Sequence, residues 1–245
     1  MDQNKSMKVY TYYKDVPSLN KNGQIKLLEC WSNNWADKGF DPVVMGENDA
    51  KLHPNFHAFT DRMGSFPMMN HNNPGYDMAC FHRFMAMTQL GGGLMSDYDC
   101  LNNHFKPCDI VVGEMTVYCP PHVPCLVSGS ALEYERIIDL FMQFDPSMYK
   151  EWLHEHSNGG TAVMDMLILA NYPDHINGVP YVKEYSTKGW EKSKAIHFPS
   201  CKCGPKKLDI MNKWTQTQST SSWPTAAPSK PSTDTFRCGN GTDFQ

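Results

Sequence analysis

Two aspartates separated by one residue, Asp97 and Asp99, are the side chains of this sequence best suited to chemistry. Three glycines and the short run Leu94 to Ser96 lead into them. If that run is a strand, the alternation of side chains points both carboxylates to the same side where the strand ends. Two converging carboxylates form a hard oxygen site that suits Mg²⁺ or Mn²⁺, shared with substrate phosphates. The alternative is a solvated acidic turn, because such short motifs recur by chance.

The segment before the glycines has the periodicity of a helix. Apolar residues recur at helical spacing between Met78 and Met85, and Asp77 is suited to cap the start. We therefore expect a helix from Asp77 to Leu90, with Arg83 inside it. The order is then an arginine-bearing helix, a glycine turn, a buried strand and the aspartate pair.

A parallel strand–helix–strand unit is expected at the start of the chain. Met7 to Tyr13 is rich in β-branched and aromatic residues, Ile25 to Lys38 has helical spacing, and Phe40 to Met45 again resembles a strand. That order predicts a right-handed parallel unit. No Gly-x-Gly-x-x-Gly or Walker-type loop follows the first strand, so dinucleotide redox chemistry and P-loop phosphoryl transfer lose their main sequence support.

The remaining segments are expected to complete one α/β domain. The expected elements are a loop over 53–74, short strands over 110–114 and 116–119, a helix from about 126 to 144, a helix over 162–171, and strands over 179–185 and 194–198. From Thr215 to Thr235 the composition shifts to Ser, Thr, Pro, Gln and Ala, which is typical of a flexible tail. We expect a domain over residues 1–212 and a tail over 213–245.

Composition excludes several classes of protein. The 245 residues carry a formal net charge of −4, and no basic cluster suggests a nucleic-acid partner. No apolar stretch approaches the ~20 residues of a membrane span. The polar start, Met1 to Ser6, predicts no signal peptide and a cytoplasmic protein.

The cysteines predict free thiols. Nine are present, and an odd number excludes complete internal pairing. Cys30, Cys80 and Cys100 fall in apolar runs, where buried thiols are expected. Cys201 and Cys203, with Cys119 and Cys125, leave a zinc site open as the less favoured alternative, since no Cys-x-x-Cys pair is present.

The order around the aspartates resembles that of nucleotide-sugar-dependent glycosyltransferases of the GT-A fold. It is most similar to the capsular-sugar, mannosyl- or galactosyltransferase-like branch, with the motif R…GG-x-Y-x-D-x-D. Here the motif runs from Arg83 through Gly92-Gly93 to Asp97-Tyr98-Asp99, with Met95 at the position of the aromatic residue. The resemblance implies a GT-A-like (Rossmann-like) mixed sheet flanked by helices.

The resemblance also implies roles for individual residues. Asp97, Asp99 and His197, the last in a strand almost a hundred positions later, would hold Mn²⁺ (or Mg²⁺). Asp97, Lys202 and Lys206 would contact the diphosphate of the donor, and Thr11, Tyr12 and Tyr13 would support the base and ribose. Asp165 would bind the donor sugar or act in catalysis, although the Gln that commonly follows it is missing here. Arg83 would add charge stabilisation.

The implied reaction is transfer of a hexosyl group from a UDP- or GDP-sugar to a hydroxyl of a glycan or other acceptor, with retention favoured over inversion. Two alternatives remain open. A metal-dependent nucleotidyltransferase or phosphohydrolase could use the same aspartates, although Tyr12 to Asp15 stands where a glycine-rich, lysine-bearing loop is usual. The missing Gln after Asp165 favours a non-catalytic carbohydrate-binding relative, whereas the intact pair Asp97 and Asp99 argues against it.

Overall fold

The computed structural model describes residues 6–17, 19–68, 74–119, 123–156, 162–186 and 189–220, without the side chains of Pro74, His156, Cys201, Ser219 and Thr220. Its main sheet has six strands in the order β2-β1-β3-β6-β5-β7. Their bounds are β1 (Met7–Tyr12), β2 (Phe40–Met45), β3 (Gly92–Ser96), β5 (Thr116–Val117), β6 (Leu126–Ser130) and β7 (Asn177–Gly178). Strand β1 runs parallel to β2 and β3, whereas β6 is antiparallel to β3 and β5. The expected fold class, a mixed α/β sheet flanked by helices, is confirmed.

A second sheet of three strands joins distant parts of the chain. It has the order β4-β9-β8, formed by β4 (Cys100–Asn102), β9 (Ala195–His197) and β8 (Val182–Glu184). Strand β4 is antiparallel to β9, and Cys100 lies directly opposite His197. This register brings the end of the aspartate pair beside the histidine.

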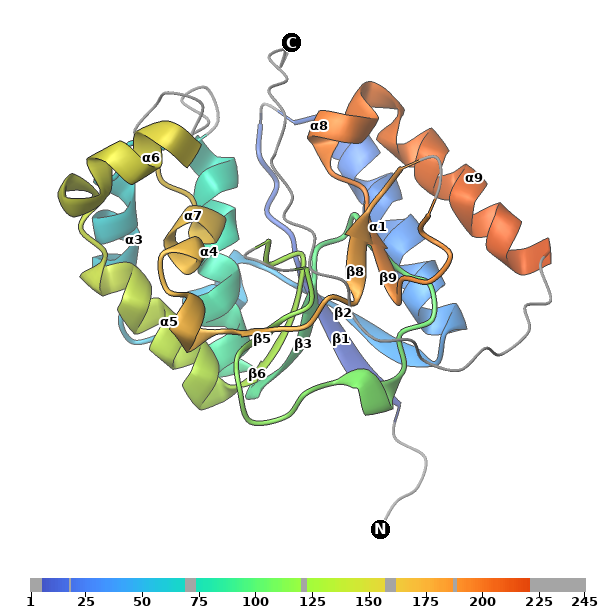
Figure 1. Cartoon of the computed structure of the whole chain (residues 1–245), viewed down its shortest axis with the longest axis horizontal. Coiled ribbons are helices and arrows are strands. Elements are labelled where there is room, and N and C mark those ends of the chain that lie inside the picture. The colour runs from blue at the N-terminus through green and yellow to red at the C-terminus, as the bar shows by residue number, and fades with distance from the viewer. Residues whose placement is uncertain are drawn as a thin grey trace.

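Helices cover both faces of the main sheet (Figure 1). They are α1 (Lys21–Asp37), α2 (Glu47–Ala50), α3 (Phe56–Gly64), α4 (Pro74–Gln89), α5 (Ala131–Gln143), α6 (Lys150–His156), α7 (Asp165–Ala170), α8 (Ser200–Cys203) and α9 (Lys207–Thr220). Helices α3 to α7 lie on one side, around a core of aromatic residues that includes Phe59, Phe81 and Phe141. Helices α1 and α9 lie on the other side, where Trp31 and Trp214 belong to the core.

Three segments differ from the sequence-based expectation. Part of the expected loop over 53–74 is helix α3, whose Phe56, Phe59 and Met63 face the core; the flanking prolines concealed this short amphipathic pattern. In the expected strand pair over 110–119, only Thr116–Val117 is a strand among the described residues. The expected helix over 126–144 begins as strand β6, because the Ser130 side chain accepts the Glu133 N–H at 3.2 Å and caps α5 at that point.

The end of the domain also differs. The expected boundary at residue 212 falls inside α9, and Trp214 within this helix is only 4% exposed. Met211 of the same helix is buried as well, so α9 packs on the core across the expected boundary, and the change of composition at Thr215 does not mark the end of the helix. Residues 221–245 of the expected tail, and 157–161 before α7, lie outside the described residues.

The free energy of unfolding should decrease as the pH is lowered, because of His82. This α4 residue is 1% exposed, packs against Phe56, and lies with Nε2 2.9 Å from the Thr60 hydroxyl. Burial lowers the pKa of His82 from 6.5 to about 4, so the unfolded chain takes up a proton at a higher pH than the folded protein does. The stabilisation is present above pH 6.5 and is lost as pH falls toward 4. Urea unfolding should show a loss of about 2 kcal/mol between pH 7.5 and pH 5 from this group.

The matched controls for this prediction are two histidine substitutions. His82→Phe should flatten that part of the pH dependence, whereas His57→Gln, at an exposed position of α3, should leave it unchanged. An equal slope in the parent and in His82→Phe would contradict the assignment to His82.

Candidate functional site

The aspartate pair lies in the turn between β3 and β4. The Cys100 N–H donates to the Asp97 carbonyl at 2.9 Å and closes this turn. The Asp97 N–H in turn donates to the Cys125 carbonyl at 2.8 Å. One hydrogen bond closes the turn and the other ties it to the residue that precedes β6. The two bonds therefore fix the shape of the turn without a ligand.

Helix α1 fixes the turn from below through two buried tryptophans. The Trp31 indole N–H donates to the Ser96 hydroxyl at 3.2 Å, and the Trp35 indole N–H donates to the Cys100 carbonyl at 3.0 Å. Both side chains are fully buried. Each end of the turn is therefore tied to a rigid helix, which is what a preorganised site requires.

Asp97, Asp99 and His197 converge at this turn. One potential ligand atom from each lies within 4.8 Å of the others, and they form the one such group of three among the described residues. The His197 Nε2 is 3.5 Å from the Asp99 Oδ1, and its Nδ1 is buried without a hydrogen-bond partner in the described part of the chain. Two carboxylates and an imidazole are a donor set that fits Mn²⁺ or Mg²⁺.

The charges of this cluster shift its pKa values in different directions. Burial raises the pKa of Asp99, but Lys207 and His197 outweigh it, so the pKa lies below its ordinary value of 3.8. Burial, with the charge of Asp99, raises the pKa of Asp97 against the opposing effect of Arg83. Burial lowers the pKa of His197, but Asp99 and Asp97 raise it more, and the net pKa lies above 6.5. A cation that binds here therefore competes with a proton on His197 at low pH.

Arg83 connects two carboxylates across the site. Its guanidinium pairs with Asp97 through Nη1 and with Asp165 through Nη2, while Nε donates to the Cys80 carbonyl at 3.0 Å. Arg83 is 6% exposed and Asp165 3% exposed. The expected pair of site residues, Arg83 and Asp165, thus lies together beside the aspartate turn, and Arg83 is already engaged on both sides.

The position of Asp165 follows from a short contact between loops. Asp165 is the first residue of α7. Val163, two residues before it, donates its N–H to the Pro67 carbonyl at 2.7 Å. The Asp165 Oδ1 accepts the Met166 N–H at 2.8 Å, which satisfies one donor of the helix start. Asp165 is therefore held by its own helix and by Arg83 together.

Lys207 is a contact that the sequence reasoning missed. This first residue of α9 donates from Nζ to the Asp99 Oδ2 at 2.6 Å. The two lysines that were expected are elsewhere engaged or exposed: Lys202 pairs with Glu184, and Lys206 is exposed and makes no ion pair with the residues that the structure describes. The sequence signal is the break at Gly204-Pro205: Lys206 ends the 3-10 turn Gly204–Lys206, and Lys207 is the first residue of α9.

The residues expected to support a nucleotide lie at the end of β1. The hydroxyls of Thr11, Tyr12 and Tyr13 are buried and have no hydrogen-bond partner in the described part of the chain. Tyr13 packs edge-on against Tyr98, with ring centroids 6.5 Å apart, which places it beside the aspartate turn. Buried hydroxyls without partners are costly, which favours a ligand at this strand end. Alternation places Tyr12 on the opposite side from Thr11 and Tyr13. The Tyr12 ring belongs to the core that includes Phe81.

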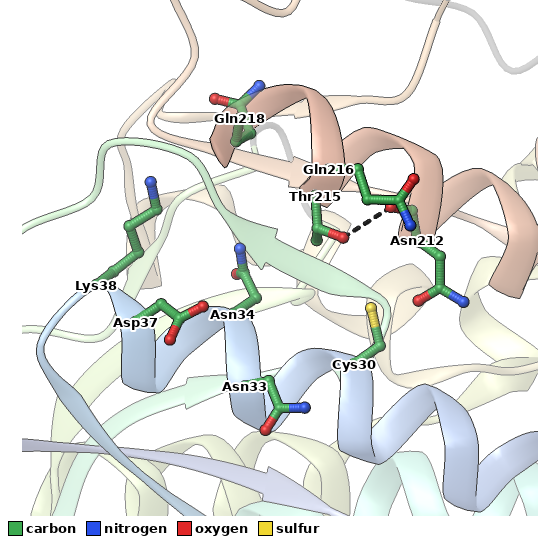
Figure 2. A pocket seen from close by; sticks show the side chains of 9 residues that line it. All are labelled: Cys30, Asn33, Asn34, Asp37, Lys38, Asn212, Thr215, Gln216 and Gln218. Atoms are coloured by element: carbon green, nitrogen blue, oxygen red, sulfur yellow. Dashed lines mark hydrogen bonds between the residues drawn. The ribbon is translucent and has the colours of Figure 1, made fainter. Parts of the chain in front are cut away.

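A separate cavity lies between α1 and α9 (Figure 2). It measures about 290 Å³ and is lined by polar side chains such as Asn33, Asp37, Asn212 and Gln216. Asp97, Asp99 and His197 are not among the residues that line it. Its chemistry is that of two solvated helix faces, and the candidate site is the aspartate turn.

Comparisons with known proteins find a family model that matches part of the sequence and solved structures that are similar to most of the chain. Residues 2–105 match a family model described as a domain of unknown function (DUF8765), which includes the aspartate turn and ends before His197. No curated protein matches the sequence. Similar solved structures include the galactosyltransferase LgtC in complex with donor and acceptor sugar analogues, at 11% identity and a TM-score of 0.46, covering 89% of this chain and 98% of that one.

A second similar structure is a glycosyltransferase involved in the glycosylation of the major capsid of PBCV-1, at 10% identity and a TM-score of 0.46, covering 85% of this chain and all of that one. An active-site mutant of LgtC is similar at 10% identity and a TM-score of 0.47, covering 86% and 96%. At this identity and TM-score the similarity does not show which reaction, if any, this chain catalyses. No helix among the described residues is long and apolar enough to cross a membrane.

Proposed function

We propose that this chain is a metal-dependent glycosyltransferase of the GT-A type. It would transfer a hexosyl group from a UDP- or GDP-sugar to a hydroxyl of a glycan or other acceptor, with retention of configuration. The observation that carries the proposal is that Asp97 and Asp99 lie close to His197, which is almost a hundred positions farther along the sequence. Two acidic ligands and a histidine from a distant strand are the set that the motif resemblance implied.

The metal, Mn²⁺ or Mg²⁺ held by Asp97, Asp99 and His197, would neutralise charge on the departing diphosphate as a Lewis acid. Lys207 would add a positive charge from the start of α9, where it already contacts Asp99. Lys202 and Lys206 remain candidates for contacts to the outer phosphate. Thr11, Tyr12 and Tyr13 would receive the base and ribose with their unpaired hydroxyls.

Arg83 and Asp165 would orient the donor sugar. The guanidinium pairs with both Asp97 and Asp165, so it keeps the carboxylate of α7 at a fixed place relative to the aspartate turn. A carboxylate held in place on both sides is suited to accept hydrogen bonds from sugar hydroxyls. In a retaining transfer no protein base has to activate the acceptor. This agrees with the ion pair between Asp165 and Arg83, because a carboxylate paired with an arginine is a poor base.

Incubation with UDP- and GDP-hexoses and Mn²⁺ distinguishes this proposal from the two alternatives. Release of free hexose with a nucleoside diphosphate supports glycosyl transfer. Cleavage within the diphosphate without release of sugar supports a nucleotidyltransferase or phosphohydrolase. Binding of the donor without turnover supports a carbohydrate-binding protein.

The His197→Ala variant tests the long-range ligand. Loss of the imidazole should raise the Mn²⁺ concentration for half-maximal donor hydrolysis by at least about 10–100-fold, the range known for changes around metal ligands. His175→Ala, at an exposed position of the 3-10 turn Pro173–His175 that contacts Arg136 of α5, serves as the histidine control. Equal Mn²⁺ dependence in parent and His197→Ala would make His197 an ordinary strand residue.

A further inference from the structure

The carboxylate of Asp99 is already occupied on both of its oxygens. Lys207 Nζ lies 2.6 Å from Oδ2, and His197 Nε2 lies 3.5 Å from Oδ1. The side chains of Lys207 and Asp99 are 12% and 16% exposed, so the pair is largely screened from water. A divalent cation that uses Asp99 therefore meets an ammonium group that is already in place.

Lys207 is positioned by the helix that it begins, because that helix packs on the hydrophobic core. Lys207 begins α9, and Met211 and Trp214 of the same helix are buried. The Trp214 ring packs against Phe198, at a centroid distance of 5.8 Å, and Phe198 directly follows His197. One hydrophobic contact thus holds the lysine-bearing helix to the strand that carries the candidate ligand.

We propose that Lys207 is a built-in competitor of the divalent cation at Asp99, an inference that rests on the cation site of the proposed function. In the metal-free protein the ammonium neutralises the carboxylate. When Mn²⁺ or Mg²⁺ binds, the two positive charges repel one another at this short range, and Nζ must leave Oδ2. Metal affinity is therefore reduced by the cost of displacing Lys207.

Displacement of Lys207 would also couple the binding of the metal to the binding of the diphosphate. The released ammonium stays tethered to the start of α9, beside the cluster, and a phosphate oxygen is a suitable new partner for it. A nucleoside diphosphate would thus recover the ion pair that the metal breaks. Because coupling between ligands is reciprocal, metal would strengthen diphosphate binding by the same factor.

Direct titration with Mn²⁺ alone, followed by the electron paramagnetic resonance signal of the free ion, tests the competition without any turnover. Lys207→Met removes the charge and keeps a chain of similar length. It should bind Mn²⁺ about tenfold more tightly or better, because a nearby positive charge has been removed. Lys207→Arg, which keeps the charge, and Lys206→Met, at the exposed neighbour, should match the parent.

The outcomes separate the inference from the proposed function. Equal or weaker Mn²⁺ binding by Lys207→Met, with binding by the parent intact, overturns the competition and leaves the cation site standing. Absence of Mn²⁺ binding in the parent and in every variant overturns both. Melting temperatures of the four proteins show whether Lys207→Met is folded.

A second measurement on the parent does not depend on that variant. Acetylation of lysine amines by an acylating reagent, mapped by mass spectrometry, should label Lys207 several-fold faster at saturating Mn²⁺ than without metal. Lys206 should be labelled at the same rate in both conditions. Unchanged labelling of Lys207 when Mn²⁺ is bound would show that the ammonium stays on Asp99, which contradicts the competition.

Discussion

Asp99→Asn is expected to lose metal-dependent donor turnover by at least about 100-fold, since changes around metal ligands alone cost about 10–100-fold. The amide keeps the shape of the side chain but removes the charge on which His197 and Lys207 both converge. The fold should persist, because Trp31 and Trp35 hold the turn through Ser96 and Cys100 and not through Asp99.

Donor hydrolysis with and without Mn²⁺ measures the loss of turnover, and calorimetry of UDP-sugar binding with and without Mn²⁺ shows whether the metal-dependent part of donor affinity is lost with it. The matched control is Asp209→Asn, which removes an exposed carboxylate from the first turn of α9 and should behave as the parent does. If Asp99→Asn keeps the parental gain in donor affinity with Mn²⁺, the assignment of Asp99 as a metal ligand fails.

Arg83→Met should produce the largest loss of stability among single substitutions at the site. It leaves Asp165, which is 3% exposed, without its cationic partner and also releases Asp97. Breaking a buried pair by removing one partner typically costs about 3–5 kcal/mol, because an uncompensated charge remains in a poorly solvated place. Urea unfolding at neutral pH measures the loss.

Two further variants show whether the orphaned charge is the cause. Asp165→Asn in the Arg83→Met background should recover part of the lost stability, because the amide carries no charge to desolvate. Arg136→Met removes a partly exposed arginine that pairs with Glu133 and should cost about 1 kcal/mol or less. A loss in Arg83→Met no larger than that in Arg136→Met would mean that the buried bridge contributes little.

Local patterns in the sequence were sufficient for the elements that surround the aspartate pair. The strand over Phe40–Met45 has the bounds that were predicted, and the helix through Arg83 and the strand before Asp97 were predicted within a few residues. The reason is that alternation, helical spacing and glycine stops are properties of neighbouring residues. The α/β class followed from the order of these elements, whereas the mixed sheet was implied by the resemblance.

The convergence of the site was decided by pairing between distant strands. Asp99 meets His197 because β4 and β9 pair with Cys100 opposite His197, a register that no local pattern specifies. The sequence could nominate His197 only through a resemblance. Which lysine reaches Asp99 was likewise settled by packing: Trp214 holds α9 so that Lys207, and not the neighbouring Lys206, faces the carboxylate.

The pairing of Arg83 with Asp97 and Asp165, and the helical state of residues 56–64, also required the tertiary structure. A buried charge such as that of Arg83 is costly unless oppositely charged side chains from other elements pair with it. A nine-residue helix such as α3 is stable only where a core covers its apolar face. By itself, the sequence determined the periodic elements and the aspartate turn. The partners of each charged side chain were decided by the tertiary structure, because strand register and helix packing depend on contacts between residues that are far apart in the chain.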